Sequence, residues 1–302
     1  MSEHYIHSVE SANEQGRESV ESGSHVPIID VIRHGQTTYK ELTDPSFRFD
    51  PNAEGFTFDP EHLDLTEEGI INVEETARTL GERIDSEHEI ILIISSPNFR
   101  AQSTALIIGR SLESQGIAML LPYDRIRSTS SLRQIIVKEE ADVDEWIAAD
   151  AALREQNSEH AHRPPFERYN AIAARLEIDL GEIYGEGEEE IDARFNRFLR
   201  HMTNANSWLR SETKGLLEGK RLRVIAVTHE EVPSMFMQKA LGATEHMRNA
   251  QILEVRPHGN LPKGGRNVAD VELVAKGEGS QSRTGTISNQ FTTINGPPIN
   301  RE

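Results

Sequence analysis

The stretch IIDVIRHGQT, residues 28–37, constrains what this chain can fold into more than any other. An apolar, largely β-branched run ends in a cation, an imidazole and a glycine, Arg33, His34 and Gly35. Such a run is typical of a buried strand, and polar groups at its end cannot be buried without partners. Because ligands bind at the carboxyl ends of strands in open α/β sheets, we expect a site here. Gly35 allows a sharp turn and a close approach to His34.

Composition excludes several classes of protein. The 302 residues carry a net charge of −18 without a Lys/Arg-rich run, so neither nucleic acid nor an anionic membrane surface is expected as a partner. The absence of cysteine excludes disulfides, a thiolate nucleophile and a cysteine-based zinc site. No window of 18 apolar residues and no secretory signal is visible, so we expect a cytoplasmic protein without a membrane span.

The chain divides by composition into a domain and two tails. Residues 1–25 are rich in Glu and Ser and predict a disordered acidic tail. Residues 26–276 carry the apolar runs of one domain, with an irregular insertion at about 155–187 that we expect to lie over the core. Residues 277–302 are rich in Gly, Ser, Thr and Asn and predict a flexible C-terminal tail.

Strands and amphipathic helices alternate within the domain, which favours a three-layer α/β fold with a mostly parallel sheet. A helix is expected to start at Thr66, because Ile70, Val73 and Ala77 begin an apolar stripe behind it. Strands are expected at 28–32, 89–95, 117–121 and 222–228, with edge strands at 251–255 and 270–274.

Three of these strands are followed by polar residues of related character. Arg33 and His34 follow the first, Arg100 lies in the helix after the second, and His229 follows the strand that ends at residue 228. Any one of these ends alone is more simply explained as surface. Together they predict a cationic cup that suits a phosphoryl group, because guanidinium groups match its oxygens bidentately.

A neutral imidazole in such a cup can attack phosphorus, and the phosphohistidine can then be hydrolysed or passed on. The arginines and the second histidine would stabilise charge in the transition state. This arrangement requires no metal and no cofactor, so we expect neither. The expected partner is a small phosphorylated substrate, and nothing in the pattern predicts an oligomeric state.

The same residues resemble the motifs of the histidine phosphatase superfamily, the phosphoglycerate-mutase-like proteins. Residues 32–37 (IRHGQT) resemble its opening motif, and Asp64-Leu65-Thr66 with Gly69 resembles its first helix start. Ser95-Ser96-Pro97 with Arg100 is similar to its second-arginine motif. Val227-Thr228-His229 is similar to the strand that carries its second histidine.

This resemblance implies a Rossmann-like α/β/α sandwich in which the 155–187 insertion forms part of a cap. It implies that His34 is the nucleophile, that Arg33, Arg100 and His229 bind the phosphate, and that Gln36 and Thr37 line the pocket mouth. The implied activity is a phosphomonoesterase, a hydrolase acting through a phosphohistidine. The alternatives are a phosphoglycerate-type mutase and a catalytically weak phosphoester-binding or interaction module.

One departure concerns the proton donor. Many members carry a glutamate in a Leu-x-Glu segment, and this chain has Gln134 at that position, which cannot donate a proton as a general acid. Glu230 directly follows His229 and is the expected replacement, because the acid-phosphatase branch has an aspartate there. Glu139 and Glu140 are the alternative candidates.

Overall fold

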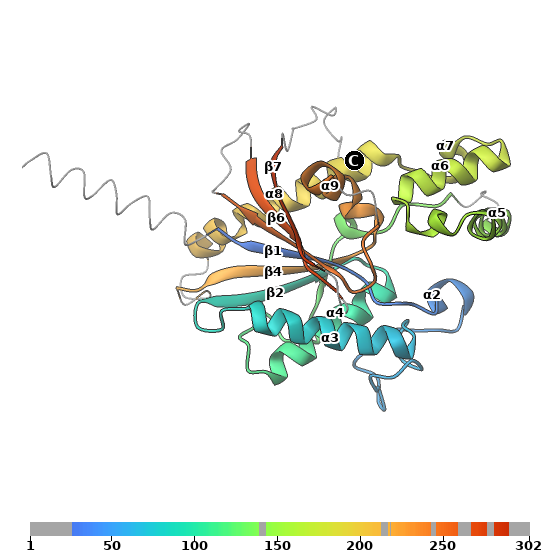
Figure 1. Cartoon of the computed structure of the whole chain (residues 1–302). Helices are drawn as coiled ribbons and strands as arrows, with labels where there is room; N and C mark the ends of the chain where they lie inside the picture. The colour runs from blue at the N-terminus through green and yellow to red at the C-terminus, as the bar shows by residue number, and fades with distance from the viewer. Residues whose placement is uncertain are drawn as a thin grey trace, which may run out of the picture.

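The chain is built on one sheet with the strand order β3-β2-β4-β1-β5-β6-β7 (Figure 1). The structure is a computed structural model that describes residues 26–138, 143–212, 217, 219–242, 246–258, 267–276 and 281–289. The strands are β1 (Ile28–Arg33), β2 (Glu89–Ser95), β3 (Arg127–Ser128), β4 (Arg221–Thr228), β5 (Ile252–Pro257), β6 (Asn267–Leu273) and β7 (Arg283–Asn289). The three apolar runs expected as buried strands are β1, β2 and β4, at the centre of the sheet.

The sheet is mixed, which corrects the expectation of a mostly parallel one. The pairs β3-β2, β2-β4 and β4-β1 are parallel, whereas β1-β5, β5-β6 and β6-β7 are antiparallel. The connections from β5 to β6 and from β6 to β7 are too short for the crossover helix that a parallel pair needs.

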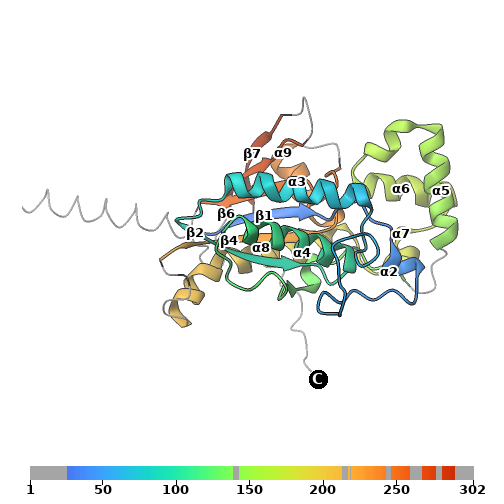
Figure 2. The same ribbon diagram turned by 90° about the horizontal axis from the view of Figure 1, so that it is seen from below.

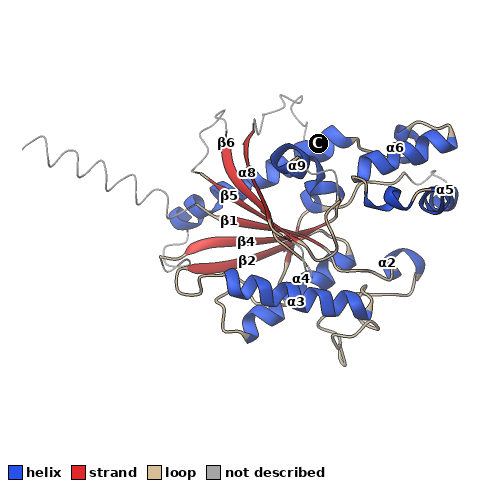
Figure 3. Cartoon of the chain, in the orientation of Figure 1, coloured by secondary structure: helices blue, strands red, loops and turns tan. Residues whose placement is uncertain are grey.

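Helices cover both faces of the sheet, which confirms the three-layer α/β/α architecture (Figure 3). On one face lie α3 (Glu67–Arg83) and α4 (Phe99–Ser114), and on the other lie α8 (Glu188–Glu212) and α9 (Glu231–Leu241). Thr66 caps α3 as expected, because its side-chain oxygen accepts a hydrogen bond from the Gly69 N–H at 2.9 Å. No described helix is long and apolar enough to cross a membrane.

A group of helices lies beyond the carboxyl ends of β1 and β4 (Figure 2). We call these helices the cap: α5 (Val143–Gln156), α6 (Pro165–Leu176) and α7 (Leu180–Ile183). Trp146 of α5 contacts Tyr169 of α6 and Tyr184, with ring centroids 6.2 and 5.4 Å apart. The cap therefore begins with α5, before residue 155, where the insertion was expected to start, because Trp146 of α5 packs against Tyr169 of α6.

Two segments differ from the sequence-based expectation. The run at 117–121 forms a single bridge, between Met119 and Ile91, because Pro122 has no N–H to continue the ladder. Residues 283–289, expected in the C-terminal tail, form β7, which pairs with β6 and buries Ile287. Tertiary pairing here overrides a composition typical of a loop. The expected N-terminal tail lies outside the described residues.

Backbone hydrogen bonds align the carboxyl ends of the central strands. Arg33 lies opposite Thr228, and the His34 N–H donates to the Thr228 carbonyl at 2.9 Å. The Ser96 N–H donates to the Val227 carbonyl at 2.8 Å. The residues that follow β1, β2 and β4 therefore meet at one edge of the sheet.

Two glycines let the loop after β1 pack on the start of α3. A Cβ on Gly69 would lie 2.2 Å from the Gln36 carbonyl oxygen, and one on Gly35 would lie 2.8 Å from Val73. The Thr66 N–H donates to the same Gln36 carbonyl at 2.9 Å. This close approach positions the backbone beside His34.

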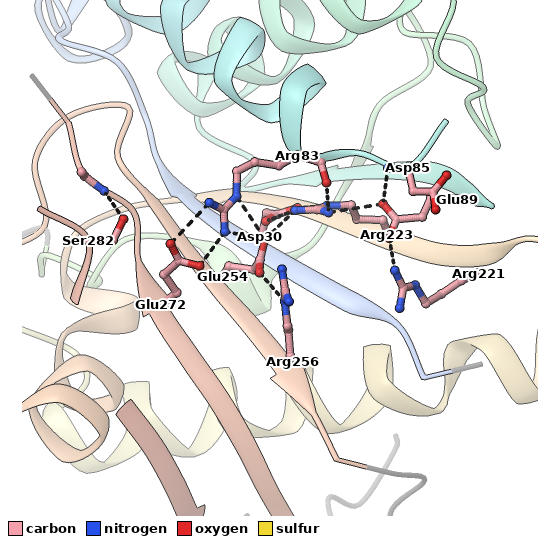
Figure 4. Close-up of polar contacts among 11 residues, drawn as sticks. Asp30, Arg83, Asp85, Glu89, Arg221, Arg223, Glu254, Arg256, Glu272 and Ser282 are labelled. Carbon is pink, nitrogen blue, oxygen red and sulfur yellow. Dashed lines mark hydrogen bonds and ion pairs between the residues drawn. The ribbon is translucent and has the colours of Figure 1, made fainter. Parts of the chain in front are cut away.

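The amino-terminal half of the sheet holds buried charges on the α3 side (Figure 4). We call Asp30, Glu89, Arg223 and Glu254 the strand network; they come from β1, β2, β4 and β5, and each is at most 1% exposed. Three arginines at its rim pair with it, Arg83, Arg221 and Arg256, and Glu272 pairs with Arg83.

Arg223 is the centre of the strand network and uses all five of its N–H donors. Two bonds at 2.6 and 3.0 Å go to Asp30, one at 2.6 Å goes to Glu254 and one at 3.2 Å goes to Glu89. The fifth reaches the Arg83 carbonyl at 3.0 Å. Burial works to lower the pKa of Arg223, but its acidic partners raise it overall. A buried arginine is tolerated here because every donor has an acceptor.

Candidate active site

The structure brings Arg33, His34, Arg100 and His229 together around one cavity of about 240 Å³. The cavity is lined by residues at the ends of β1 and β4, at the start of α4 and in helices α5 and α6 of the cap. The His34 and His229 rings meet edge to face, with centroids 5.0 Å apart and planes at 63°. Residues far apart in the sequence thus form the expected cationic cup.

His34 is buried with one ring nitrogen engaged. Its Nδ1 lies 2.7 Å from the Gly35 carbonyl oxygen, which can only accept, so Nδ1 carries the hydrogen. In the neutral ring this leaves the lone pair on Nε2. Burial lowers the pKa of His34 well below its ordinary value, and the charges of Arg100 and Arg33 lower it further. The imidazole is therefore neutral at neutral pH and has one nitrogen free to react.

His229 is held by the segment after β2. Its Nε2 lies 2.8 Å from Ser96 Oγ, and Ser96 donates to Asn98 Oδ1 at 3.0 Å. Ser96 therefore accepts from the His229 Nε2–H, which leaves Nδ1 unprotonated in the neutral ring. Burial, then His34 and Arg100, lowers the pKa of His229 well below its ordinary value.

The two arginines of the cup each keep an unused donor. Arg33 Nε and Arg100 Nε are buried and have no hydrogen-bond partner in the part of the chain that the structure describes. The side chain of Arg100 is 1% exposed. Leaving a buried donor unpaired costs about 1–3 kcal/mol. Both residues line the cavity, so an anion bound there is a candidate acceptor for these donors.

Glu41 of the short helix α2 (Lys40–Thr43) lies against the first residues of α4 and accepts hydrogen bonds from them. Its carboxylate accepts from the Phe99 N–H at 3.0 Å and from Arg100 Nη1 at 3.3 Å. Gln134 Oε1 accepts from Arg100 Nη2. Glu41 and Gln134 thus fix both ends of the Arg100 guanidinium with one hydrogen bond each, and Nε is a buried donor without a partner among the described residues.

Glu230 lines the cavity but lies between two guanidinium groups. Its Oε1 accepts from Arg168, and its Oε2 lies 2.5 Å from Arg33 Nη1 in an ion pair whose angle is not that of a hydrogen bond. Two cations stabilise the ionised carboxylate, which is the wrong form for a proton donor. A catalytic role for Glu230 stays a prediction. Its alternatives, Glu139 and Glu140, lie outside the described residues.

Gln36 and Thr37 do not line this cavity. Gln36 is exposed, and Thr37 donates to Asp64 Oδ1 at 3.1 Å. Asp64 also accepts from the Lys40 N–H at 2.7 Å, so it holds the loop between β1 and α2. In this structure the two residues shape the loop rather than the cavity wall.

The cap supplies the outer wall, which is aromatic and aliphatic. The side chains concerned are Trp146, Ile147, Tyr169 and Ile172. Two arginines of the cap also line the cavity, but both are ion-paired. Arg154 pairs with Asp150 at 2.7 Å, and Arg168 pairs with Glu230. The outer part of the cavity therefore offers apolar surface and neutralised cations.

Sequence reasoning missed Tyr169 and Glu231. Glu231 is the first residue of α9, and its Oε1 accepts from the Tyr169 hydroxyl at 2.7 Å. Burial, then Glu231, raises the pKa of Tyr169 well above its ordinary value, so the hydroxyl keeps its proton. The adjacency of Glu231 to His229 was visible in the sequence, but the partner lies in the cap, which no local pattern places over the site.

The described residues bring one group of possible metal ligands together, Asp59, Glu61 and His62. These side chains lie in the loop between α2 and α3, and none lines the cavity.

The comparisons with known proteins agree with the geometry. Residues 29–177 match the family model of the histidine phosphatase superfamily, branch 1. The family model therefore assigns the segment 29–177 of this chain to the superfamily. The matched segment contains Arg33, His34 and Arg100 but ends before His229, which the register of β4 against β1 brings to the same place. A comparison with curated protein sequences finds no match.

Several solved structures are similar to this chain at low sequence identity. A phosphoglycerate mutase from Bacillus anthracis str. Sterne is 18% identical, with 78% of this chain and 89% of that chain covered and a TM-score of 0.44. A mycobacterial glucosyl-3-phosphoglycerate phosphatase is also 18% identical, with 77% and 94% covered and a TM-score of 0.40. A phytase from Hafnia alvei is 9% identical, with 88% and 91% covered and a TM-score of 0.40.

Proposed function

We propose that this protein is a phosphatase that hydrolyses a phosphomonoester through a phosphohistidine on His34. The observation that carries the proposal is a neutral imidazole with a free Nε2 beside two buried, unpartnered guanidinium donors, Arg33 Nε and Arg100 Nε. A phosphoryl group supplies both an electrophile for the nitrogen and oxygen acceptors for the donors.

In the reaction, the lone pair of His34 Nε2 attacks phosphorus and the ester oxygen leaves. Arg33 and Arg100 hold the equatorial oxygens, whose charge is greatest in the transition state. His229 takes up a proton from solvent on Nδ1 when the dianion enters the cup, donates it in a hydrogen bond to a phosphoryl oxygen, and returns it to solvent when phosphate leaves. Water attacks the phosphohistidine in the second step and releases inorganic phosphate.

The outer wall favours a phosphatase for an ester with an apolar organic part. A phosphoglycerate-type mutase must also bind a carboxylate, but Arg154 and Arg168 are already neutralised by Asp150 and Glu230. Trp146 and Ile172 instead offer apolar surface to the alcohol part of a substrate. Arg154 or Arg168 could bind a second anionic group only after its ion pair with Asp150 or Glu230 had broken.

The test is rapid quench of the enzyme with phosphoryl-labelled p-nitrophenyl phosphate. The wild type should retain label that is labile in acid and stable in base, as phosphohistidine is. His34→Ala should lose this label and lower turnover by several orders of magnitude, because the variant lacks the imidazole nitrogen that forms the phosphohistidine.

His258→Ala is the matched control, because His258 pairs with Asp270 on the exposed side of β6, outside the cavity, and should leave turnover unchanged. Label on a serine, or full activity of His34→Ala, would contradict the proposal. Phosphate binding without turnover would identify a binding module, and isomerisation of phosphoglycerate would identify a mutase.

A further inference from the structure

Three carboxylates line the cavity in the described chain: Asp150, Glu230 and Glu231. Asp150 pairs with Arg154 and with the buried His160, whose Nε2 lies 3.1 Å away. Glu230 lies between Arg33 and Arg168. Both of these carboxylates are therefore already ion-paired with arginines.

Glu231 is different, because no cation in the described part of the chain lies within ion-pair distance of it, although its charge acts on Arg33 at longer range. Its Oε1 accepts from the neutral Tyr169 hydroxyl, which fixes the direction of the carboxyl group. Its Oε2 is buried and has no hydrogen-bond partner among the described residues. A buried oxygen without a partner in a polar cavity calls for a proton or a ligand to complete it.

We infer that Glu231 is the general acid that protonates the leaving oxygen, and that Tyr169 positions it. The inference rests on the proposed phosphatase reaction. It also accounts for Gln134, which stands where a proton donor was expected and instead accepts from Arg100.

The proton balance of the reaction is complete. As the lone pair of His34 Nε2 forms the P–N bond, the P–O bond breaks and its electron pair moves to the ester oxygen. Glu231 Oε2 gives its proton to that oxygen, and the alcohol leaves. In the second step Glu231 takes a proton from the water that attacks phosphorus. The P–N bond then breaks, its electron pair returns to His34, and inorganic phosphate departs.

The test compares Glu231→Gln on two esters, p-nitrophenyl phosphate and n-butyl phosphate. An alkoxide needs a proton to leave, whereas p-nitrophenolate does not. The variant should lower kcat/KM for butyl phosphate by ~10²–10⁴-fold and that for p-nitrophenyl phosphate by less than about tenfold. Glu231→Asp, which keeps a transferable proton, should recover part of the loss on butyl phosphate.

Glu230→Gln is the matched control. Because Glu230 holds Arg33, its loss should lower turnover of both esters to a similar degree. Selective loss of butyl phosphate turnover in Glu230→Gln, or equal loss on both esters in Glu231→Gln, would overturn the assignment. Tyr169→Phe should lose butyl phosphate turnover selectively but less than Glu231→Gln, because the carboxyl keeps its proton and loses its orientation.

Trapped phosphohistidine separates the two proposals. If wild type and Glu231→Gln both form labelled enzyme from p-nitrophenyl phosphate, the phosphatase proposal stands and the ester comparison alone decides on Glu231. If the wild type forms no labelled enzyme from either ester, the phosphatase proposal fails and the assignment of Glu231 fails with it.

Discussion

Two arginines in this molecule are equally buried and have opposite surroundings. The side chains of Arg223 and Arg100 are each 1% exposed. Arg223, in the strand network, uses every N–H donor on carboxylates and a carbonyl. Arg100, at the carboxyl end of the same sheet, keeps Nε without a partner in the described chain.

The difference separates a structural charge from a functional one. A guanidinium whose donors are all used can hold strands together but has nothing to offer a ligand. A guanidinium with an unused N–H donor carries the desolvation penalty of that donor until an anion binds, and this penalty falls at the candidate site. Burial alone does not distinguish the two arginines, whereas a count of their hydrogen bonds does.

The largest effect in this comparison should follow from Arg223→Met. The substitution leaves Asp30, Glu89 and Glu254 as buried carboxylates without their shared cation. Removing one partner of a buried ion pair typically costs about 3–5 kcal/mol, so the free energy of unfolding should fall by that amount. Urea denaturation measures it. A fall below about 1 kcal/mol would show that the network does not hold the sheet together.

Arg100→Met should reverse the pattern. Turnover of p-nitrophenyl phosphate should fall by about 10²–10³-fold, as expected when one donor to a transition-state oxyanion is lost. The free energy of unfolding should change by less than in Arg223→Met, because the variant also removes an unpaired buried donor. Steady-state kinetics and the same denaturation assay test the two halves. A large loss of stability with turnover retained would make Arg100 a structural residue.

A third prediction concerns acid. Because the pKa of His34 is lowered in the folded state, the unfolded chain binds a proton below about pH 6.5 and the folded one does not. The contribution of His34 to the free energy of unfolding is therefore constant above that pH. It is lost as the pH falls, at up to ~1.4 kcal/mol per pH unit.

The measurement is urea denaturation of wild type and His34→Gln between pH 8 and pH 5. The wild type should lose stability below pH 6.5 faster than the variant does. The pKa shifts of two carboxyl groups in the strand network oppose each other. Burial raises the pKa of Asp30, whereas Arg223 lowers the pKa of Glu254 despite its burial. A difference between the two proteins that does not change with pH would contradict the prediction.

The smallest effect should come from Arg256→Ala, at the rim of the strand network. Its side chain is 55% exposed and pairs with Glu254, which Arg223 and Arg83 also bind. A solvent-exposed ion pair is worth about 0–1 kcal/mol, so stability should change by no more than that. A loss as large as in Arg223→Met would mean that the rim is as important as the centre.

The sequence predicted the inner half of the site because that half is local. An apolar run followed by Arg33 and His34 marks a strand and its end at once, and Arg100 and His229 follow from the same pattern. The three-layer fold follows from the alternation of such strands with amphipathic helices.

The rest depends on tertiary placement. Asp30 and Arg223 lie inside apolar runs, and only the register of β1 against β4 shows that they pair. Tyr169 reaches Glu231 because the cap folds back over the sheet, which no local pattern encodes. β7 has a loop-like composition and becomes a strand because β6 offers it an open edge.

In the proposed reaction, the hydrogen bond from His34 to the Gly35 carbonyl would also determine the regiochemistry of the intermediate. With Nδ1 engaged at 2.7 Å, only one ring nitrogen can accept the phosphoryl group. The phosphorylated enzyme would then be a single positional isomer, τ-phosphohistidine. Antibodies selective for that isomer should detect the trapped enzyme, and those raised against the π-isomer should not.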